Sequence, residues 1–136
     1  MADRKVALIT GSGTGVGAAS ALLLAQQGYN ILVNYSRSES EARESEAACK
    51  AAGADTLLVQ GDVSADADCK ALAAAAVARW GRIDALVNNA GVSNFAGVSN
   101  WDALDTEVFQ RILAVNTIGP FQMVRACVAH LKATRG

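Results

Sequence analysis

Short apolar runs alternate with helix-length segments along the chain, and this alternation limits the folds open to it. The apolar runs lie at residues 6–9, 31–33, 56–59 and 83–87. Each run is short and bounded by turn-forming residues, which is typical of a buried strand. Strands that alternate with helices form β-α-β units around a parallel sheet. We therefore expect one α/β domain over residues 1–136, with a doubly wound parallel sheet of strand order 3-2-1-4 and helices on both faces.

Two serines are predicted to begin helices in the middle of the chain. Ser38 and Glu41 form a Ser-x-x-Glu pattern, which predicts a capping box. Ser64 is predicted to cap the next helix. Residues 92–100 are predicted to form a loop.

The last predicted helix, residues 105–133, is apolar on more than one face. A helix of this kind is normally buried on several sides. Four strands cannot cover it, so we expect it to meet a further segment or a second subunit. Pro120, with Gly119 before it, is predicted to break a backbone hydrogen bond or bend the helix.

The composition excludes several classes of protein. The chain has 12 Lys and Arg against 13 Asp and Glu, a formal net charge of −1, whereas nucleic-acid binders and polybasic membrane anchors carry a basic surplus. No apolar run approaches the roughly 18 residues of a membrane span, and no export-type cleavage signal is evident. We therefore expect a cytoplasmic protein with no nucleic-acid or membrane partner.

The three cysteines, Cys49, Cys69 and Cys127, are far apart and do not cluster with the single His130. This spacing does not fit a disulfide framework or a zinc site. We expect buried thiols and no metal site.

The segment between the first strand and the first helix is rich in glycine. It reads Thr-Gly-Ser-Gly-Thr-Gly-Val-Gly over residues 10–17. Glycines allow a tight turn, and the helix N-terminus offers N–H groups and about half a positive charge to an anion such as a diphosphate. A glycine-rich turn without a ligand is the alternative, and a P-loop is excluded because no Gly-Lys-Ser/Thr follows. The candidate cofactor-binding residues here are Gly11, Ser12, Thr14, Gly15, Val16 and Gly17.

The end of the second strand predicts which dinucleotide the chain prefers. An NAD site usually has an acidic residue about 20 residues past the glycines, but residues 34–38 read Asn-Tyr-Ser-Arg-Ser. An arginine binds phosphate in a fork, so Arg37 favours the 2′-phosphate of NADP. A solvated surface arginine is the alternative. Tyr35, Ser36 and Arg37 are the candidates.

Two more candidate segments follow the third and fourth strands. Asp62 and Val63 reach the crevice in this sheet order, where Asp62 can accept a hydrogen bond from an exocyclic amine; an acid near a helix dipole is the alternative. Asn89, Ala90 and Gly91 lie at the carboxyl edge of the sheet, where open α/β folds bind ligands. A plain turn is the alternative there.

Asn116 is a polar residue within the long apolar helix. If buried, its amide needs hydrogen-bond partners. A structural asparagine and a functional one are both open at this point.

Together, these motifs resemble the short-chain dehydrogenase/reductase family. Its Thr-Gly-x-x-x-Gly-x-Gly pattern matches residues 10–17, its Asp-Val pair residues 62–63, its Asn-Asn-Ala-Gly motif residues 88–91, and its active-site asparagine Asn116. The resemblance is nearest to the 3-oxoacyl-(acyl-carrier-protein) reductase-like group and related NADPH carbonyl reductases. It implies a Rossmann-type fold, and reduction of a carbonyl substrate, such as a 3-oxoacyl thioester, to an alcohol by hydride transfer.

The resemblance also implies a role for each motif. The backbone of residues 12–16 would hold the diphosphate, Ser36 and Arg37 the 2′-phosphate, and residues 62–63 the adenine. Residues 89–91 would line the nicotinamide ribose, and Asn116 would have a catalytic role by holding a water in the proton relay.

The chain departs from the family pattern in two ways. Many NADP-binding members carry a basic residue where this loop has Thr14, which leaves Arg37 as the only predicted cation. The family's Tyr-x-x-x-Lys pair, which protonates the carbonyl, is missing: four residues after Tyr29 and Tyr35 stand Val33 and Glu39. Family members are about twice this length, so we expect an N-terminal half whose sheet ends before the fifth strand and which does not turn over alone.

The sequence also predicts an oligomeric partner and leaves two alternative functions open. The resemblance implies a homo-oligomer formed through the long C-terminal helix. The chain could instead be a non-catalytic dinucleotide-binding or interaction module. It could also be half of an NAD-linked alcohol dehydrogenase, with NAD in place of NADP.

Overall fold

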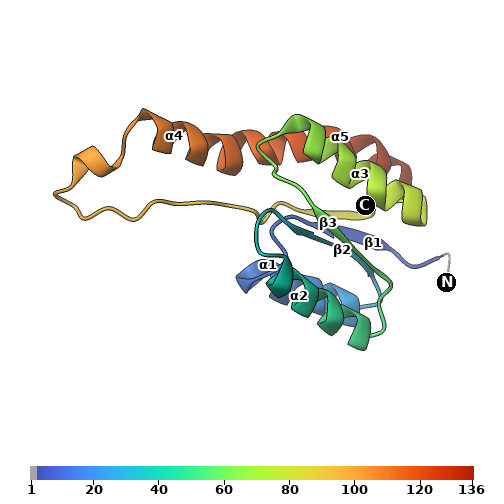
Figure 1. Cartoon of the computed structure of the whole chain (residues 1–136). Coiled ribbons are helices and arrows are strands. Elements are labelled where there is room, and N and C mark those ends of the chain that lie inside the picture. The colour runs from blue at the N-terminus through green and yellow to red at the C-terminus, as the bar shows by residue number, and fades with distance from the viewer. Residues whose placement is uncertain (1–2) are drawn as a thin grey trace.

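The computed structural model describes residues 3–136 and contains one parallel four-stranded sheet (Figure 1). The strands are β1 (Val6–Ile9), β2 (Asn30–Tyr35), β3 (Thr56–Gln60) and β4 (Ala85–Val87), in the order β3-β2-β1-β4. β1 lies between β2 and β4, with Ala7 opposite both Ile31 and Ala85. Every pairing is parallel, which confirms the predicted Rossmann-like α/β fold and its strand order.

Helices cover both faces of this sheet. They are α1 (Gly15–Gln26) and α2 (Glu39–Ala51) on one face, and α3 (Asp66–Trp80) and α5 (Gly119–Thr134) on the other (Figure 1). In β1, Ala7 and Ile9 pack into the apolar cluster beneath α1 and α2, whereas Leu8 packs into the cluster beneath α3 and α5. Because both faces are covered, the four successive residues of β1 are all apolar, as is usual for parallel sheets.

The two predicted serine caps do not form. Ser38 does precede α2, but its side chain makes no capping hydrogen bond within the described residues. α3 begins later than predicted, with Ala65 at its N-cap. The hydroxyl of Ser64 is used elsewhere, because it donates to the Asp62 carboxylate at 2.7 Å.

β4 is shorter than predicted because a side chain replaces the backbone at its start. Residues 83–87 were expected to form the strand, but pairing begins at Ala85. The Asp84 carboxylate accepts the Val6 N–H at 2.8 Å, and the Asp84 N–H donates to the Val6 carbonyl at 2.9 Å. Arg82 also bonds this carboxylate.

The predicted last helix is continuous but changes its winding in the middle. It consists of α4 (Thr106–Leu113), a π-helical turn (Ala114–Ile118) and α5. Pro120 has no N–H to continue the α-helical pattern, and the wider π turn ends just before it. Insertions of this kind are a known way for a helix to absorb such a break. The break in the α-helical hydrogen bonding that was predicted at Pro120 is therefore found, in the form of a π-helical turn just before it.

One long side of this helix is apolar and exposed. Its inner side, including Val115, Met123 and Cys127, is buried against the sheet and α3. The exposed stripe comprises Phe109, Leu113, Ile118, Phe121, Val124 and Val128. Before the helix, the loop of residues 92–100 and the short 3-10 turn Trp101–Ala103 reach away from the sheet, as predicted for the loop (Figure 1).

The same helix corrects the expectation that no apolar segment approaches the length of a membrane span. The 29 residues Thr106–Thr134 are long and apolar enough, by length and composition alone, to cross a membrane. A core helix of a water-soluble domain passes this test equally well. Here the inner side packs on α3, and Arg125 on α5 pairs with Asp66 on α3 at 2.6 Å. Only 28% of the apolar window is buried within the described chain, so this packing covers only part of the apolar segment.

Candidate functional site

A cavity of about 350 Å³ opens at the carboxyl ends of the strands. Ten of the predicted site residues line it: Gly11, Thr14, Gly15, Val16, Ser36, Asp62, Val63, Asn89, Ala90 and Gly91. A neighbouring cavity of about 270 Å³ adds Tyr35 and Arg37. The three remaining candidates, Ser12, Gly17 and Asn116, line neither cavity.

Two glycines bring the first loop close to its neighbours. Gly11 has φ +61°, and a Cβ there would lie 2.9 Å from the Cα of Ala90. A Cβ at Gly17 would lie 2.3 Å from the Gly11 carbonyl oxygen and 2.5 Å from the Asn89 side-chain nitrogen. Gly17 is therefore a packing residue of the site, since only a hydrogen fits there.

The N-terminus of α1 faces the open part of the cavity. Thr14, Gly15 and Val16 line the cavity where the helix begins. The first N–H groups of a helix have no helical acceptor, so they are available to an anion. Gly15 has φ +54° and nothing within 4 Å of a would-be Cβ. This donor set suits a diphosphate.

Ser12 is hydrogen-bonded to neighbouring segments of the chain. It is fully buried, and its N–H donates to the Asn34 carbonyl at 2.9 Å. Its hydroxyl donates to the Ile9 carbonyl and accepts the Asn34 N–H, while its carbonyl accepts the Ser45 hydroxyl at 2.7 Å. With these groups bonded within the chain, Ser12 fixes the loop, and its contact with a diphosphate stays a prediction.

Asn34 is a site residue that the sequence reasoning missed. Its side chain is buried, lines the cavity and joins three segments. The side-chain oxygen accepts the Gly11 N–H at 3.0 Å, and the amide donates to the carbonyls of Val59 and Gly61 at 3.2 Å. It therefore sets the spacing between the glycine loop and the loop that follows β3. Its place at the end of a strand, before the predicted phosphate-binding residues, was the available signal.

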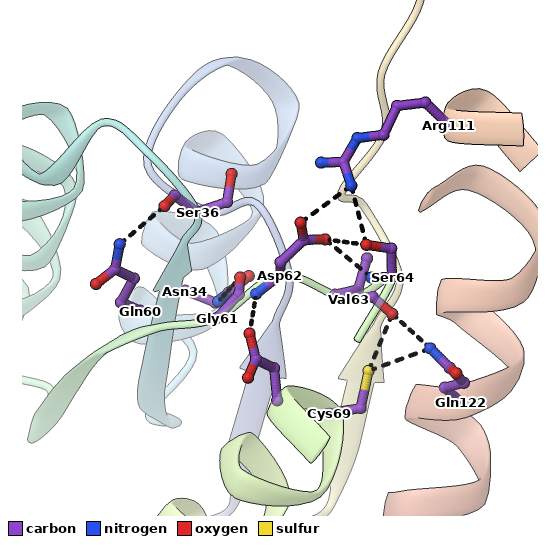
Figure 2. A network of polar contacts seen from close by, with 11 residues as sticks. Asn34, Ser36, Gln60, Gly61, Asp62, Val63, Ser64, Cys69, Arg111 and Gln122 are labelled. Atoms are coloured by element: carbon purple, nitrogen blue, oxygen red, sulfur yellow. Dashed lines mark hydrogen bonds and ion pairs between the residues drawn. The ribbon is translucent and has the colours of Figure 1, made fainter. Parts of the chain in front are cut away.

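The loop after β3 is anchored from three helices (Figure 2). Asp68 of α3 accepts the Asp62 N–H at 2.8 Å. Arg111 of α4 donates to Asp62 at 3.0 Å and to Ser64 at 2.9 Å. Gln122 of α5 donates to the Val63 carbonyl at 2.7 Å. Arg111 was not among the predicted residues, because its partner is 49 positions away.

The Asp62 carboxyl is kept ionised by its neighbours. Partial burial acts to raise its pKa, but hydrogen bonds from the Ser64 hydroxyl and N–H and from Arg111 outweigh it and lower the pKa below the ordinary value. An ionised carboxylate accepts hydrogen bonds and donates none. Asp62 therefore presents an acceptor to the cavity.

The end of β4 is tied to the end of β1 by Asn89 and Thr10. The Asn89 amide donates to the carbonyls of Thr10 and Gly11, at 3.2 and 3.0 Å. The Thr10 hydroxyl accepts the N–H groups of Asn89 and Ala90, at 3.1 and 3.0 Å. Asn89 and Thr10 therefore link the carboxyl ends of β4 and β1.

Asn116 lies on the π turn and bonds the loop after β4. Its side-chain oxygen accepts the Val92 N–H and its amide donates to the Val92 carbonyl, both at 2.8 Å. A Cβ at Gly91 would lie 3.5 Å from the same oxygen. Asn116 thus borders the segment that lines the cavity, and its catalytic role stays a prediction.

The other candidate chemistry is limited. Among residues 3–136, no group of three or more His, Cys, Asp or Glu side chains is placed to hold a metal ion. The three cysteines are free and buried. Burial raises the pKa of the Cys69 and Cys127 thiols to about 11, so these thiols are poor nucleophiles at neutral pH.

The fold and the cavity at the strand ends define a Rossmann-like α/β domain. The family model for short chain dehydrogenases matches residues 5–136, and the chain belongs to this family.

Similar proteins support this assignment. A protein named as a ketoacyl reductase of the granaticin polyketide synthase from Streptomyces violaceoruber is 40% identical over 129 residues, which cover 95% of this chain and 50% of the relative. A crystal structure of a Burkholderia xenovorans protein described as a short-chain dehydrogenase/reductase superposes with a TM-score of 0.93 at 40% identity, covering 97% of this chain and 54% of the other. An NADH-dependent reductase responsible for alginate metabolism superposes with a TM-score of 0.84 at 32% identity, covering 98% and 55%. The chain thus spans about half the length of the relatives it matches.

Proposed function

We propose that this chain is the cofactor-binding half of an NADP-dependent oxidoreductase that reduces a carbonyl compound to an alcohol. One observation carries the proposal: a single cavity joins the N-terminus of α1 to the Asp62 carboxylate and to Gly91. This arrangement offers donors to a diphosphate, an acceptor to the adenine and an open backbone to a ribose. When bound, the nicotinamide would supply the hydride.

Arg37 supports NADP over NAD. Its side chain is exposed beside the second cavity, which it shares with Ser36 and Thr14. It takes part in none of the ion pairs found among residues 3–136. A guanidinium in this position is available to a 2′-phosphate. One similar structure is named as NADH-dependent, which keeps NAD as the alternative cofactor.

The substrate class is proposed from the relatives. One of them is named as a ketoacyl reductase, which supports a 3-oxoacyl thioester or a similar small carbonyl compound. The sequence holds no Tyr-x-x-x-Lys pair, so we propose that this chain alone binds the cofactor without turnover. A purely non-catalytic dinucleotide-binding module is the second candidate. Turnover by a mixture of this chain with a polypeptide that carries the pair would decide against that candidate.

The exposed stripe on α4 and α5 supports self-association. Phe121 is 63% and Leu113 52% exposed, on the same helical side. Large exposed apolar surfaces usually mark an interface. We propose that this helix packs against a second copy of the chain, and that the oligomer resides in the cytoplasm.

Calorimetric titration of the purified chain with NADPH and with NADH tests the cofactor assignment. The expected result is saturable binding of both, with NADPH the tighter. Arg37→Met should remove the preference, because the 2′-phosphate loses its cation, and should leave the affinity for NADH unchanged. Arg43→Met is the matched control, since within residues 3–136 Arg43 pairs with Glu39 alone, on the exposed side of α2. A preference that survives Arg37→Met would reject the assignment of NADP to Arg37.

A further inference from the structure

The Asp62 carboxylate is held from two directions. One oxygen accepts the Ser64 N–H at 2.9 Å and the Ser64 hydroxyl at 2.7 Å. The other oxygen accepts Nη1 of Arg111 at 3.0 Å. The first contacts are local to the loop, whereas the second comes from α4. Figure 2 shows the Arg111 side chain reaching from its helix toward both residues.

Arg111 stands at the boundary between two cavities. It lines the 350 Å³ cavity with Asp62, and it also lines a neighbouring cavity of about 460 Å³ that includes Ser36 and Arg37. The side chains of Arg111 and Asp62 are 40% and 36% exposed. The pair is therefore accessible to a ligand, unlike a bridge that only joins elements inside the core.

These contacts leave one hydrogen-bond acceptor position of the Asp62 carboxylate free in the described chain. A carboxylate offers about four acceptor positions, and Ser64 and Arg111 occupy three of them in the described chain. The remaining position is on the oxygen that Arg111 holds. An N–H donor fits there, whereas a carbonyl oxygen would be repelled by the negative charge.

We propose that Arg111 is a positioning residue that orients the Asp62 carboxylate toward the amino group of the cofactor's purine, and so sets selectivity for adenine over a 6-oxopurine. The inference rests on the proposed function, because it takes the purine to lie beside Asp62. Without Arg111, one carboxylate oxygen has no protein partner in the described chain. The carboxylate can then rotate about its contacts with Ser64, and the acceptor no longer has a fixed direction.

The test compares two dinucleotides on the 136-residue chain. NADPH carries a 6-amino group, and reduced nicotinamide hypoxanthine dinucleotide phosphate carries a 6-oxo group in its place. In the unsubstituted chain, we expect NADPH to bind about tenfold more tightly, as one charge-assisted hydrogen bond would give. Arg111→Met should bring the ratio of the two dissociation constants close to one. A residue that only stabilised the fold would weaken both ligands equally and leave the ratio unchanged.

Two further variants define the comparison. Arg125→Met breaks a similar bridge, to Asp66 at 2.6 Å, outside these cavities, and should leave the ratio unchanged. Asp62→Ala should lower the ratio as Arg111→Met does, and the double variant should lower it no further. If Arg111→Met does not fold, Arg111→Gln is measured instead, with the same expected loss.

The outcomes separate this inference from the proposed function. Tight binding of NADPH with a ratio that Arg111→Met or Arg111→Gln leaves unchanged overturns the inference alone. A ratio near one in the unsubstituted chain also overturns it, because Asp62 then does not recognise the amino group. If neither dinucleotide binds, the proposed function and the inference both fail.

Discussion

The side-chain amide of Asn89 lies so close to Gly17 that a Cβ at residue 17 would come within 2.5 Å of its nitrogen. The same Cβ would come within 2.3 Å of the Gly11 carbonyl oxygen, which itself accepts a hydrogen bond from Asn89 at 3.0 Å. Helix α1, the glycine loop and the end of β4 therefore meet at one point. Gly11 and Asn89, which meet here, both line the cavity.

Gly17→Ala is expected to disrupt this contact. The added methyl group would push α1 away from the loop, with a loss of about 3 kcal/mol in the free energy of unfolding, at the upper end for overpacking. Urea denaturation followed by circular dichroism measures the loss. Gly97→Ala is the control, since a Cβ there has nothing within 4 Å and should change stability by less than about 0.5 kcal/mol. Equal stability of the two variants would contradict the packing described.

Asn34→Ala should be costly as well. It removes one acceptor from the Gly11 N–H and donors from the carbonyls of Val59 and Gly61, and buried unpaired groups of this kind cost about 1–3 kcal/mol each. We expect a loss of more than about 3 kcal/mol in the free energy of unfolding, measured in urea. Asn94→Ala, which removes one exposed bond to Ala103, should cost less than about 1 kcal/mol. A comparable loss in both would show that Asn34 does not hold the loops together.

Asp84 should make stability depend on pH in the acid range. Its burial acts to raise the carboxyl pKa, but hydrogen bonds from Arg82 and the Val6 N–H outweigh this and lower it below 3.8. Because folding lowers this pKa, the stabilisation is present above pH 3.8 and is lost as the pH falls through the folded-state pKa. The unfolding free energy of Asp84→Asn should therefore decline less steeply below pH 4 than that of the unsubstituted chain. Identical slopes for Asp84→Asn and the parent would contradict the prediction.

The buried thiols should resist alkylation in the folded chain. Burial raises the pKa of Cys69 and Cys127 to about 11, so little thiolate is present at pH 8. We expect iodoacetamide to label neither residue under native conditions and both in urea, as peptide mass spectrometry would show. Rapid native labelling would mean that α3 and α5 separate readily.

The exposed stripe predicts how the chain associates. Phe121, which is 63% exposed, lies on this stripe, so Phe121→Glu places a charge on the apolar surface and should abolish self-association while leaving the monomer folded. Sedimentation velocity over a range of concentrations measures this. Val98→Glu, on the loop that reaches away from the sheet, is the control and should associate like the parent. A parent chain that stays monomeric would reject the proposed oligomer.

The fold was accessible from the sequence because it depends on local patterns. Runs such as residues 6–9 and 31–33 identify strands by composition, and the crossover rule then limits their order. Ser64 shows where local patterns fail: its hydroxyl was predicted to accept a backbone N–H at the start of α3, but it donates to Asp62 and accepts from Arg111 instead. Which of these contacts forms is decided by loop geometry and helix docking, which the sequence does not display.

The site residues that could be predicted from the sequence are those that belong to short local motifs. Gly11, Asp62 and Asn89 belong to short motifs, and the structure brings them to one cavity. Arg111 and Asn34 escaped prediction because each acts on residues 23 to 49 positions away. The partners of Asn34 become visible only once the strands are paired, and those of Arg111 only once α4 is docked on the sheet.

The most direct test of cofactor binding at the strand ends is a titration of the ¹⁵N-labelled chain with NADPH, followed by amide chemical shifts. We predict saturable shifts concentrated at Gly15, Val16, Asp62 and Gly91, with the amides of residues 44–50 on the outer helix α2 unchanged. Shifts confined to the exposed stripe of α4 and α5, or the absence of shifts at millimolar NADPH, would contradict the assignment of this cavity to the cofactor.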